Sequence, residues 1–200
     1  TNKGSERDVN YNIFKNRDWK FDIYGNFNNN KNEVTDLKGT ASIELTTQSI
    51  SSRAVQGEAL GVLWATRAQR NADGTLALDA NGFPQIDPDQ GVVGDPNPDW
   101  RGGLGFTAGY KGLSLNVLFE TFQGADYADR TRFVLYQFGT HADVGNEVTL
   151  TQDVVNSAGT VFTAGTTVRG NLEDFGGGTV LKDQQWYTTL GGGLGGSAIN

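Results

Sequence analysis

Cysteine is absent from this 200-residue chain, which also has only four prolines and one histidine. Without cysteine it can form neither a disulfide framework nor a thiolate metal site. Basic residues are also few: 16 lysines and arginines stand against 23 aspartates and glutamates, a formal charge of -7. Nucleic-acid binding needs clustered basic residues, and the basic residues here are scattered along the chain. Nucleic acid is therefore not an expected partner.

Long apolar runs are missing as well. No segment approaches the roughly 18 apolar residues of a membrane helix, and the polar start, Thr1–Asp8, is not a signal peptide. Apolar residues without glycine make up 36% of the chain, and glycine is frequent at 28 of 200 residues. Aromatic residues nevertheless reach 10%, which argues against disorder. This combination is typical of transmembrane β-barrels, and we expect both ends to be cuts in a longer chain.

Four stretches alternate between apolar and polar side chains with the period of two that marks a half-buried strand. The apolar positions are Val9, Tyr11 and Ile13; Trp19, Phe21, Ile23 and Phe27; Leu104, Phe106, Ala108 and Tyr110; and Leu113, Leu115, Val117 and Phe119. They predict strands at about 6–14, 18–28, 103–111 and 113–123, close to the ~9–11 residues that a tilted strand needs to cross a bilayer. Turn-forming residues at Lys15–Asp18 and Lys111–Gly112 predict two hairpins.

These strands predict an all-β fold in which the whole chain is part of an antiparallel transmembrane barrel. Long extracellular loops are expected at about 29–99 and 124–200. The second loop contains further β-like segments, of which the first is expected to lie above the membrane and the others to form hairpins: Arg132–Phe138, Glu147–Thr151, and Thr160–Thr163 with Thr166–Arg169. An all-β sandwich remains the alternative, because alternation does not distinguish a lipid-facing surface from a core.

The sequence around the third strand carries a family resemblance. Gly94-Asp95-Pro96-Asn97-Pro98-Asp99-Trp100, followed by Tyr110-Lys111-Gly112, closely resembles the late barrel region of SusC/RagA-type TonB-dependent transporters of Bacteroidetes outer membranes. Four more segments resemble parts of the same family region and occur in the same order. They are Thr1–Glu6, Asp18–Val34, Asn71–Gly74 and Asp79–Gly82. The resemblance covers residues 1–123, whereas 124–200 matches only in general character. Physically, the two prolines keep the residues before them extended, which suits a strand entrance with Trp100 at the membrane–water boundary.

The resemblance implies a barrel of about 22 strands with a plugged lumen, of which the plug domain is absent from this chain. It implies TonB-dependent import of oligosaccharides or peptides across the cell outer membrane, without chemical change and therefore without enzyme activity. The implied partners are a SusD-like surface lipoprotein, TonB-ExbB-ExbD acting through the missing N-terminal part, and the lipid bilayer. One alternative is a structural or partner subunit of a larger outer-membrane complex, and a third is an extracellular β-rich glycan-active enzyme.

Substrate contacts are expected from the polar sides of the strands and from loop aromatic residues. The strand candidates are Asp22, Tyr24, Asn26, Asn28, Asn116 and Glu120. The loop candidates, which could stack on a sugar ring or bury against a lid, are Trp64, Tyr127, Trp186 and Tyr187. For each residue the alternative is hydration of the wall or ordinary loop packing.

The sequence offers little for catalysis or metal binding. The single histidine, His141, has no motif partner of the HExxH or Gly-x-Ser-x-Gly kind, and we expect it to be a solvated loop residue. The loop carboxylates between Asp79 and Asp99 lack the rigid scaffold that paired glycosidase carboxylates need. No cofactor is expected. Calcium in the Asn71–Asp89 loop is kept as an alternative to solvated turns, since it prefers oxygen ligands.

Overall fold

The computed structural model describes residues 1–47 and 50–189. Antiparallel strands dominate, which confirms the predicted all-β class. The chain divides into two compact units. Unit 1 comprises Thr1–Thr46, Ser52–Leu63 and Gly94–Tyr127, and unit 2 comprises Thr47–Ser51, Trp64–Val93 and Ala128–Asn200. Within the described residues, no helix has the length and apolar character needed to cross a membrane.

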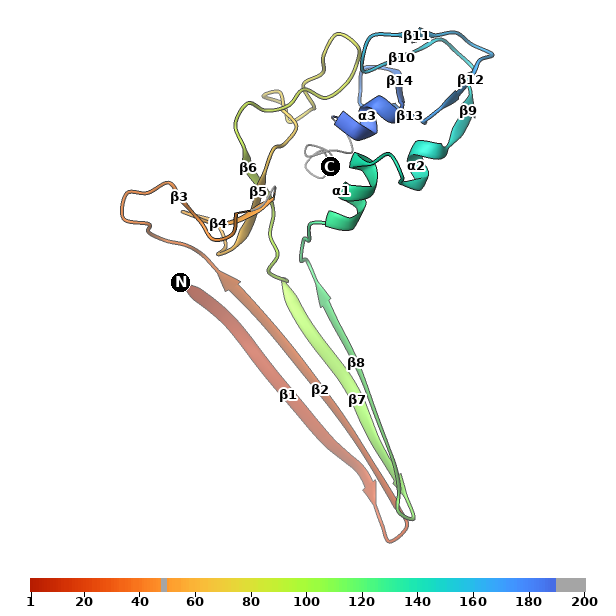
Figure 1. The fold of residues 1–200 in the computed structure, drawn as a ribbon. Coiled ribbons are helices and arrows are strands. Elements are labelled where there is room, and N and C mark those ends of the chain that lie inside the picture. The colour runs from red at the N-terminus through yellow and green to blue at the C-terminus, as the bar shows by residue number, and fades with distance from the viewer. Residues whose placement is uncertain (48–49, 190–200) are drawn as a thin grey trace. The chain divides into compact units, whose positions relative to one another are not determined.

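Unit 1 is dominated by a sheet of four long antiparallel strands, hereafter the long sheet (Figure 1). Its order is β1-β2-β7-β8, with β1 at Asn2–Lys15, β2 at Trp19–Asn32, β7 at Trp100–Tyr110 and β8 at Leu113–Gln123. Strands therefore form at all four predicted ranges. β1 and β2 are longer than predicted because the Asn-rich segment 28–32 continues to pair with residues 2–6. The described residues contain this open sheet and no closed barrel.

Both predicted hairpin turns are present in the long sheet. Between β1 and β2, the Asn16 side-chain oxygen accepts hydrogen bonds from the backbone N–H groups of Asp18 (3.0 Å) and Trp19 (2.8 Å). Between β7 and β8, Lys111 and Gly112 have φ values of 45° and 92°. Two consecutive positive φ values are the requirement of a tight hairpin turn whose twist matches the flanking strands.

The regions predicted as long loops, 29–99 and 124–200, contain short strands and helices in their described parts. A second four-stranded sheet has the order β3-β4-β5-β6. Its strands are β3 (Ser42–Glu44), β4 (Ser51–Val55), β5 (Val62–Ala65) and β6 (Gly91–Gly94). Residues 68–86 fold back on themselves through isolated bridges such as Ala68 to Ile86. The tail at 190–200 lies outside the described residues.

Unit 2 contains short helices and strands. The helices are α1 (Arg130–Gln137), α2 (Ala142–Gly145) and α3 (Gln184–Thr189). The strands are β9 (Glu147–Thr149), β10 (Val154–Asn156), β11 (Val161–Phe162), β12 (Thr167–Arg169), β13 (Asn171–Asp174) and β14 (Thr179–Lys182). Four of these strands form a sheet of order β11-β10-β14-β13, in which β10 and β14 are parallel. The other two form a separate β12-β9 pair.

Two details of this region differ from the sequence prediction. The predicted β-like segment Arg132–Phe138 is wrong, because it forms helix α1, whose first turn is capped by the Asp129 side chain accepting from the Arg132 N–H at 2.9 Å. The predicted partnership of Thr160–Thr163 with Thr166–Arg169 is also wrong. β11 instead pairs with β10, and β12 pairs with β9.

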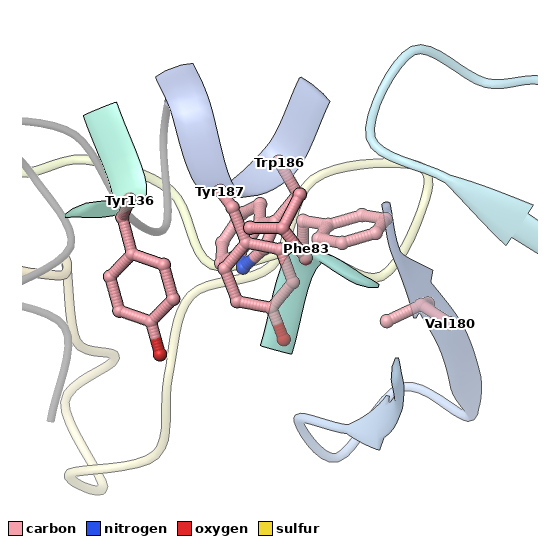
Figure 2. Close-up of a cluster of buried hydrophobic side chains, with 6 residues drawn as sticks. Phe83, Tyr136, Val180, Trp186 and Tyr187 are labelled. Carbon is pink, nitrogen blue, oxygen red and sulfur yellow. The ribbon is translucent and has the colours of Figure 1, made fainter. Parts of the chain in front are cut away.

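Unit 2 is held together by two apolar clusters. The larger consists of Phe83, Tyr136, Val144, Val180, Trp186 and Tyr187, most of which Figure 2 shows. The Phe83 side chain is fully buried and its ring lies 5.0 Å from that of Trp186, centroid to centroid. The smaller cluster consists of Leu150, Val154, Val168 and Leu181. Residues far apart in the chain therefore share one interior.

Candidate functional site

The strand candidates are brought together on one face of the long sheet. Residues directly opposite each other share a face, because successive side chains of a strand alternate. The register gives the rows Asn12–Asp22–Thr107–Asn116, Asn10–Tyr24–Gly105–Leu118, Asp8–Asn26–Gly103–Glu120 and Glu6–Asn28–Arg101–Phe122. This polar face therefore contains all six of the strand candidates, as the alternation predicts.

Tyr24 connects three strands across the polar face. Its hydroxyl donates to the Asn116 side-chain oxygen at 2.7 Å, although β7 lies between the two residues. The ring reaches over β7 at Gly105, where an added Cβ would lie 2.4 Å from the Tyr24 Cζ atom. Glycine at this position is therefore what allows the Tyr24 ring to lie flat across the sheet.

The bond between Tyr24 and Asn116 can be tested with Tyr24→Phe, which keeps the ring over Gly105 and removes only the hydroxyl. We expect a loss of about 1 kcal/mol in the free energy of unfolding, typical of one hydrogen bond, measured by urea denaturation of the complete protein. Tyr11→Phe is the control, because Tyr11 is 62% exposed on the opposite face. Equal effects of the two changes would contradict the bracing role of Tyr24.

Asp22 is occupied by its neighbours on the same face. The Asn12 amide donates to one of its oxygens, and the Lys20 ammonium lies 2.9 Å from the other. Together with the Tyr24–Asn116 bond, these contacts satisfy the part of the polar face nearest the hairpin turns. The polar groups of Asp22 and Tyr24 are thus bonded to other residues of the long sheet.

The part of the polar face farther from the turns is different. A hollow of about 470 Å³ is lined there mainly by Glu6, Asp8, Asn26, Asn28, Arg101, Glu120 and Phe122. The side chains of the six polar residues among these make no hydrogen bond or ion pair with another residue that the structure describes. They present carboxylate, amide and guanidinium groups beside the Phe122 ring, which is 63% exposed. Such a surface can hydrogen-bond a polar ligand.

Sequence reasoning missed several residues of this hollow. Glu6, Asp8, Arg101 and Phe122 were not among the candidates, although they share rows with Asn26, Asn28 and Glu120. For Glu6 and Asp8 the signal was present, because both occupy polar positions of the first alternating stretch. Arg101 has the parity of the polar positions Gly105 and Thr107, but it precedes the predicted strand at 103–111. Phe122 is an apolar residue at a polar position of its strand, so the alternation does not predict it.

The loop aromatic candidates do not join this site. Trp186 and Tyr187 are only 3% and 5% exposed, since they pack in the core of unit 2. Trp186, a predicted substrate contact, is placed in this core, where its ring is tilted against those of Phe83 and Phe175. Trp64 is half-buried within β5. Tyr127 is 84% exposed at the end of the last segment of unit 1.

His141 belongs to a packed polar group, not to a solvated loop as expected. Its Nδ1 accepts the N–H of Asp143 at 3.2 Å, which caps α2, and its ring lies 4.2 Å from the Tyr136 ring, centroid to centroid. The Tyr136 hydroxyl donates to the Asp143 carboxylate and accepts from Arg132 at 2.9 Å. Burial, followed by the bond to Asp143, raises the pKa of Tyr136. The group joins α1 to α2.

The proposed calcium loop uses its carboxylates for turns. One oxygen of Asp73 accepts from the Thr75 hydroxyl (2.6 Å) and N–H (3.0 Å), and these bonds lower the Asp73 pKa. One oxygen of Asp87 accepts the Asp89 N–H, which together with Arg67 lowers the Asp87 pKa. Across the described part of the chain, no three acidic or histidine side chains converge as metal ligands would.

The face opposite the polar one is apolar and exposed. Its outward residues include Val9 (65%), Leu104 (65%), Leu113 (77%), Leu115 (55%) and Phe119 (71%). Aromatic pairs bound it at both ends: the ring centroids of Trp19 and Tyr110 are 4.3 Å apart near the turns, and those of Phe27 and Trp100 are 5.8 Å apart at the other end. Soluble proteins rarely expose so continuous an apolar surface.

The Gly94–Trp100 segment is tied to its surroundings at the start of β7. Asp95 accepts the Asn97 N–H at 2.9 Å through its side chain and donates its own N–H to Asp126 at 2.8 Å. The Asn97 amide donates to the Leu60 carbonyl at 3.1 Å. The segment therefore anchors a strand entrance, as its prolines suggested, and its polar groups face the chain itself. Comparison with protein-family models and with curated proteins found no match.

Proposed function

We propose that the long sheet is part of the wall of a transmembrane β-barrel in the outer membrane, and that the protein is a SusC-like, TonB-dependent importer of oligosaccharides or peptides. The apolar face of the sheet supports the barrel, and the resemblance of Gly94–Trp100 to SusC/RagA-type transporters supports the importer. Trp100 and Tyr110 begin and end β7, an 11-residue strand. At ~3.3 Å per residue they lie about 33 Å apart along the strand, or about 25 Å along the membrane normal at a tilt of ~40°. The apolar band of outer-membrane barrels is also about 25 Å tall and is bounded by aromatic residues.

The open edges of the long sheet support the same proposal. β1 and β8 are its edge strands, so each has one side without a partner strand among the described residues. Unpaired backbone groups are costly in lipid, and a closed barrel removes them. Further strands of a barrel of about 22 strands would pair with these edges, and the polar face would then line the lumen.

Fluorescence quenching at two adjacent positions tests this arrangement. The 200 residues contain no cysteine, and any cysteine elsewhere in the complete protein is first replaced by serine. In the complete protein, Phe119→Cys and Glu120→Cys are each labelled with bimane and reconstituted in vesicles containing brominated phospholipid. We expect strong quenching at position 119 and little at 120, because neighbouring residues of β8 point to opposite faces. Quenching at neither position would contradict the barrel, and would support a sandwich with a protein layer over the apolar face.

Import itself is tested in cells that lack the gene for the complete protein. Loss of growth on a defined oligosaccharide or peptide, restored by the intact gene, is the expected result, together with co-purification of a SusD-like lipoprotein. The second candidate is a structural or partner subunit of a larger outer-membrane complex. Normal uptake combined with stable association with unrelated envelope proteins would favour that alternative.

A further inference from the structure

The outer third of the long sheet, which is the end away from the hairpin turns, separates charge between its two faces. Lys3 lies directly opposite Lys31 in the β1–β2 register, and Arg7 lies opposite Phe27. These residues share the apolar face, because the alternation is uninterrupted from Asn2 to Asn12. The Ser5 hydroxyl bonds the Asn29 side chain at 2.7 Å between them, which shows the shared side directly.

Within the four strands, the three cations are the only charged residues on this end of the apolar face. The acids of the same strands, Glu6, Asp8 and Glu120, lie on the polar face. The nearest acid of the same alternation, Glu33, follows the end of β2 and forms no ion pair with another residue that the structure describes. Lys3, Arg7 and Lys31 are exposed and have no ion pair or side-chain hydrogen bond with another residue that the structure describes. Like charges directly opposite each other destabilise a sheet. In a chain of net charge -7, this local excess of positive charge lacks an internal counter-charge.

The positions of Lys3, Arg7 and Lys31 along their strands indicate which group balances their positive charge. Phe27 and Trp100 mark the end of the apolar band, and the Arg7–Phe27 pair lies at this level. Lys3 and Lys31 lie four residues farther out, which is about 13 Å along the strand. Cations near the bilayer surface attract anionic lipid headgroups. Lysine and arginine are also strong donors to phosphate oxygens.

We propose that Lys3, Arg7 and Lys31 form a site for the phosphate-bearing headgroup of an anionic lipid in the leaflet at this end of the sheet. The proposal rests on the proposed function, because it requires the apolar face to lie in a bilayer. The lipid chains cover Val9, Leu104 and Phe119, and the phosphate groups neutralise the Lys3–Lys31 pair. The occupant is a lipid and not a free anion, since the cations border an apolar surface instead of lining a pocket.

The test uses the complete protein in nanodiscs of phosphatidylcholine that contain diphosphoryl lipid A or its dephosphorylated form. Lipid bound to the protein is measured by native mass spectrometry after extraction. We expect selective retention of the phosphorylated form, weakened about fivefold for each cation removed and thus about 25-fold in Arg7→Gln/Lys31→Gln. The matched control is Lys20→Gln/Arg101→Gln, which removes the same charge from the polar face and leaves retention unchanged.

Three outcomes would overturn the lipid site. These are equal retention of the two lipids, equal loss in both double variants, or full displacement by millimolar inorganic phosphate, which would show a simple anion site. The quenching experiment at positions 119 and 120 separates these failures from failure of the proposed function. Quenching at 119 without lipid selectivity rejects only the lipid site, whereas absence of quenching rejects both.

Discussion

Leu104→Arg is expected to destabilise the long sheet by about 2–4 kcal/mol in a bilayer, because an arginine near the middle of the apolar band must be buried in hydrocarbon. Leu104 lies between the aromatic ends of β7 and is 65% exposed in the sheet. On a water-exposed surface the same change would cost no more than about 0.5 kcal/mol. The measurement is urea-induced unfolding of the complete protein in phospholipid vesicles, followed by tryptophan fluorescence.

Leu118→Arg provides the matched control for this experiment. Leu118 is 47% exposed and pairs with Gly105, next to Leu104 in β7 but on the polar face. The same arginine there would face a watery lumen and is expected to change stability by about 0.5 kcal/mol or less. Similar small costs at both positions would mean that the apolar face does not contact lipid.

Phe83→Ala is expected to cost unit 2 about 3–5 kcal/mol of stability, the usual range for removing a fully buried aromatic ring. Phe83 is 0% exposed and contacts the rings of Trp186 and Phe175. Figure 2 shows its ring beside those of Trp186 and Tyr187. The loss of stability is measured as faster amide hydrogen exchange and faster protease cleavage within unit 2 of the complete protein. The exchange rate of the long sheet in the same sample serves as the internal reference.

The control for the Phe83 change is Phe138→Ala. Phe138 follows α1 and is 74% exposed, so its removal is expected to change local stability by about 0.5 kcal/mol or less. If both variants exchange at the wild-type rate, the interior of unit 2 does not depend on the aromatic cluster. If the long sheet also loosens in Phe83→Ala, the two units are not independent in stability.

The long sheet was predictable from the sequence because a single physical rule governs it. Alternating side chains fix which residues share a face, and this placed Tyr24 with Asn116 correctly without any knowledge of register. The added length of β1 and β2 was not predictable, since residues 28–32 are nearly all asparagine and show no alternation. Backbone pairing with the neighbouring strand extends them.

Unit 2 was much less predictable. Arg132–Phe138 contains Phe133, Val134 and Tyr136, types favoured in strands, yet the Asp129 cap and the packing of Tyr136 in the core select a helix. The burial of Trp186 depends on Phe83, about a hundred positions earlier in the chain, and on Val180. No local pattern reports such a contact. The lining of the hollow on the polar face was likewise predicted incompletely, because β7 begins at Trp100 and so includes Arg101, which lies before the predicted strand.

The aromatic cluster also constrains the order in which the protein can fold. Phe83 and Trp186 come from segments that flank β7 and β8 in the chain, so their contact closes a loop containing that whole hairpin. In the proposed topology, both segments lie on the side of the membrane opposite the β7–β8 turn, because they leave the hairpin at its open end, where Trp100 pairs with Gln123. The core of unit 2 can therefore form only after the second segment has been delivered to the same side as the first. Formation of this core would then slow the withdrawal of the β7–β8 hairpin from the membrane.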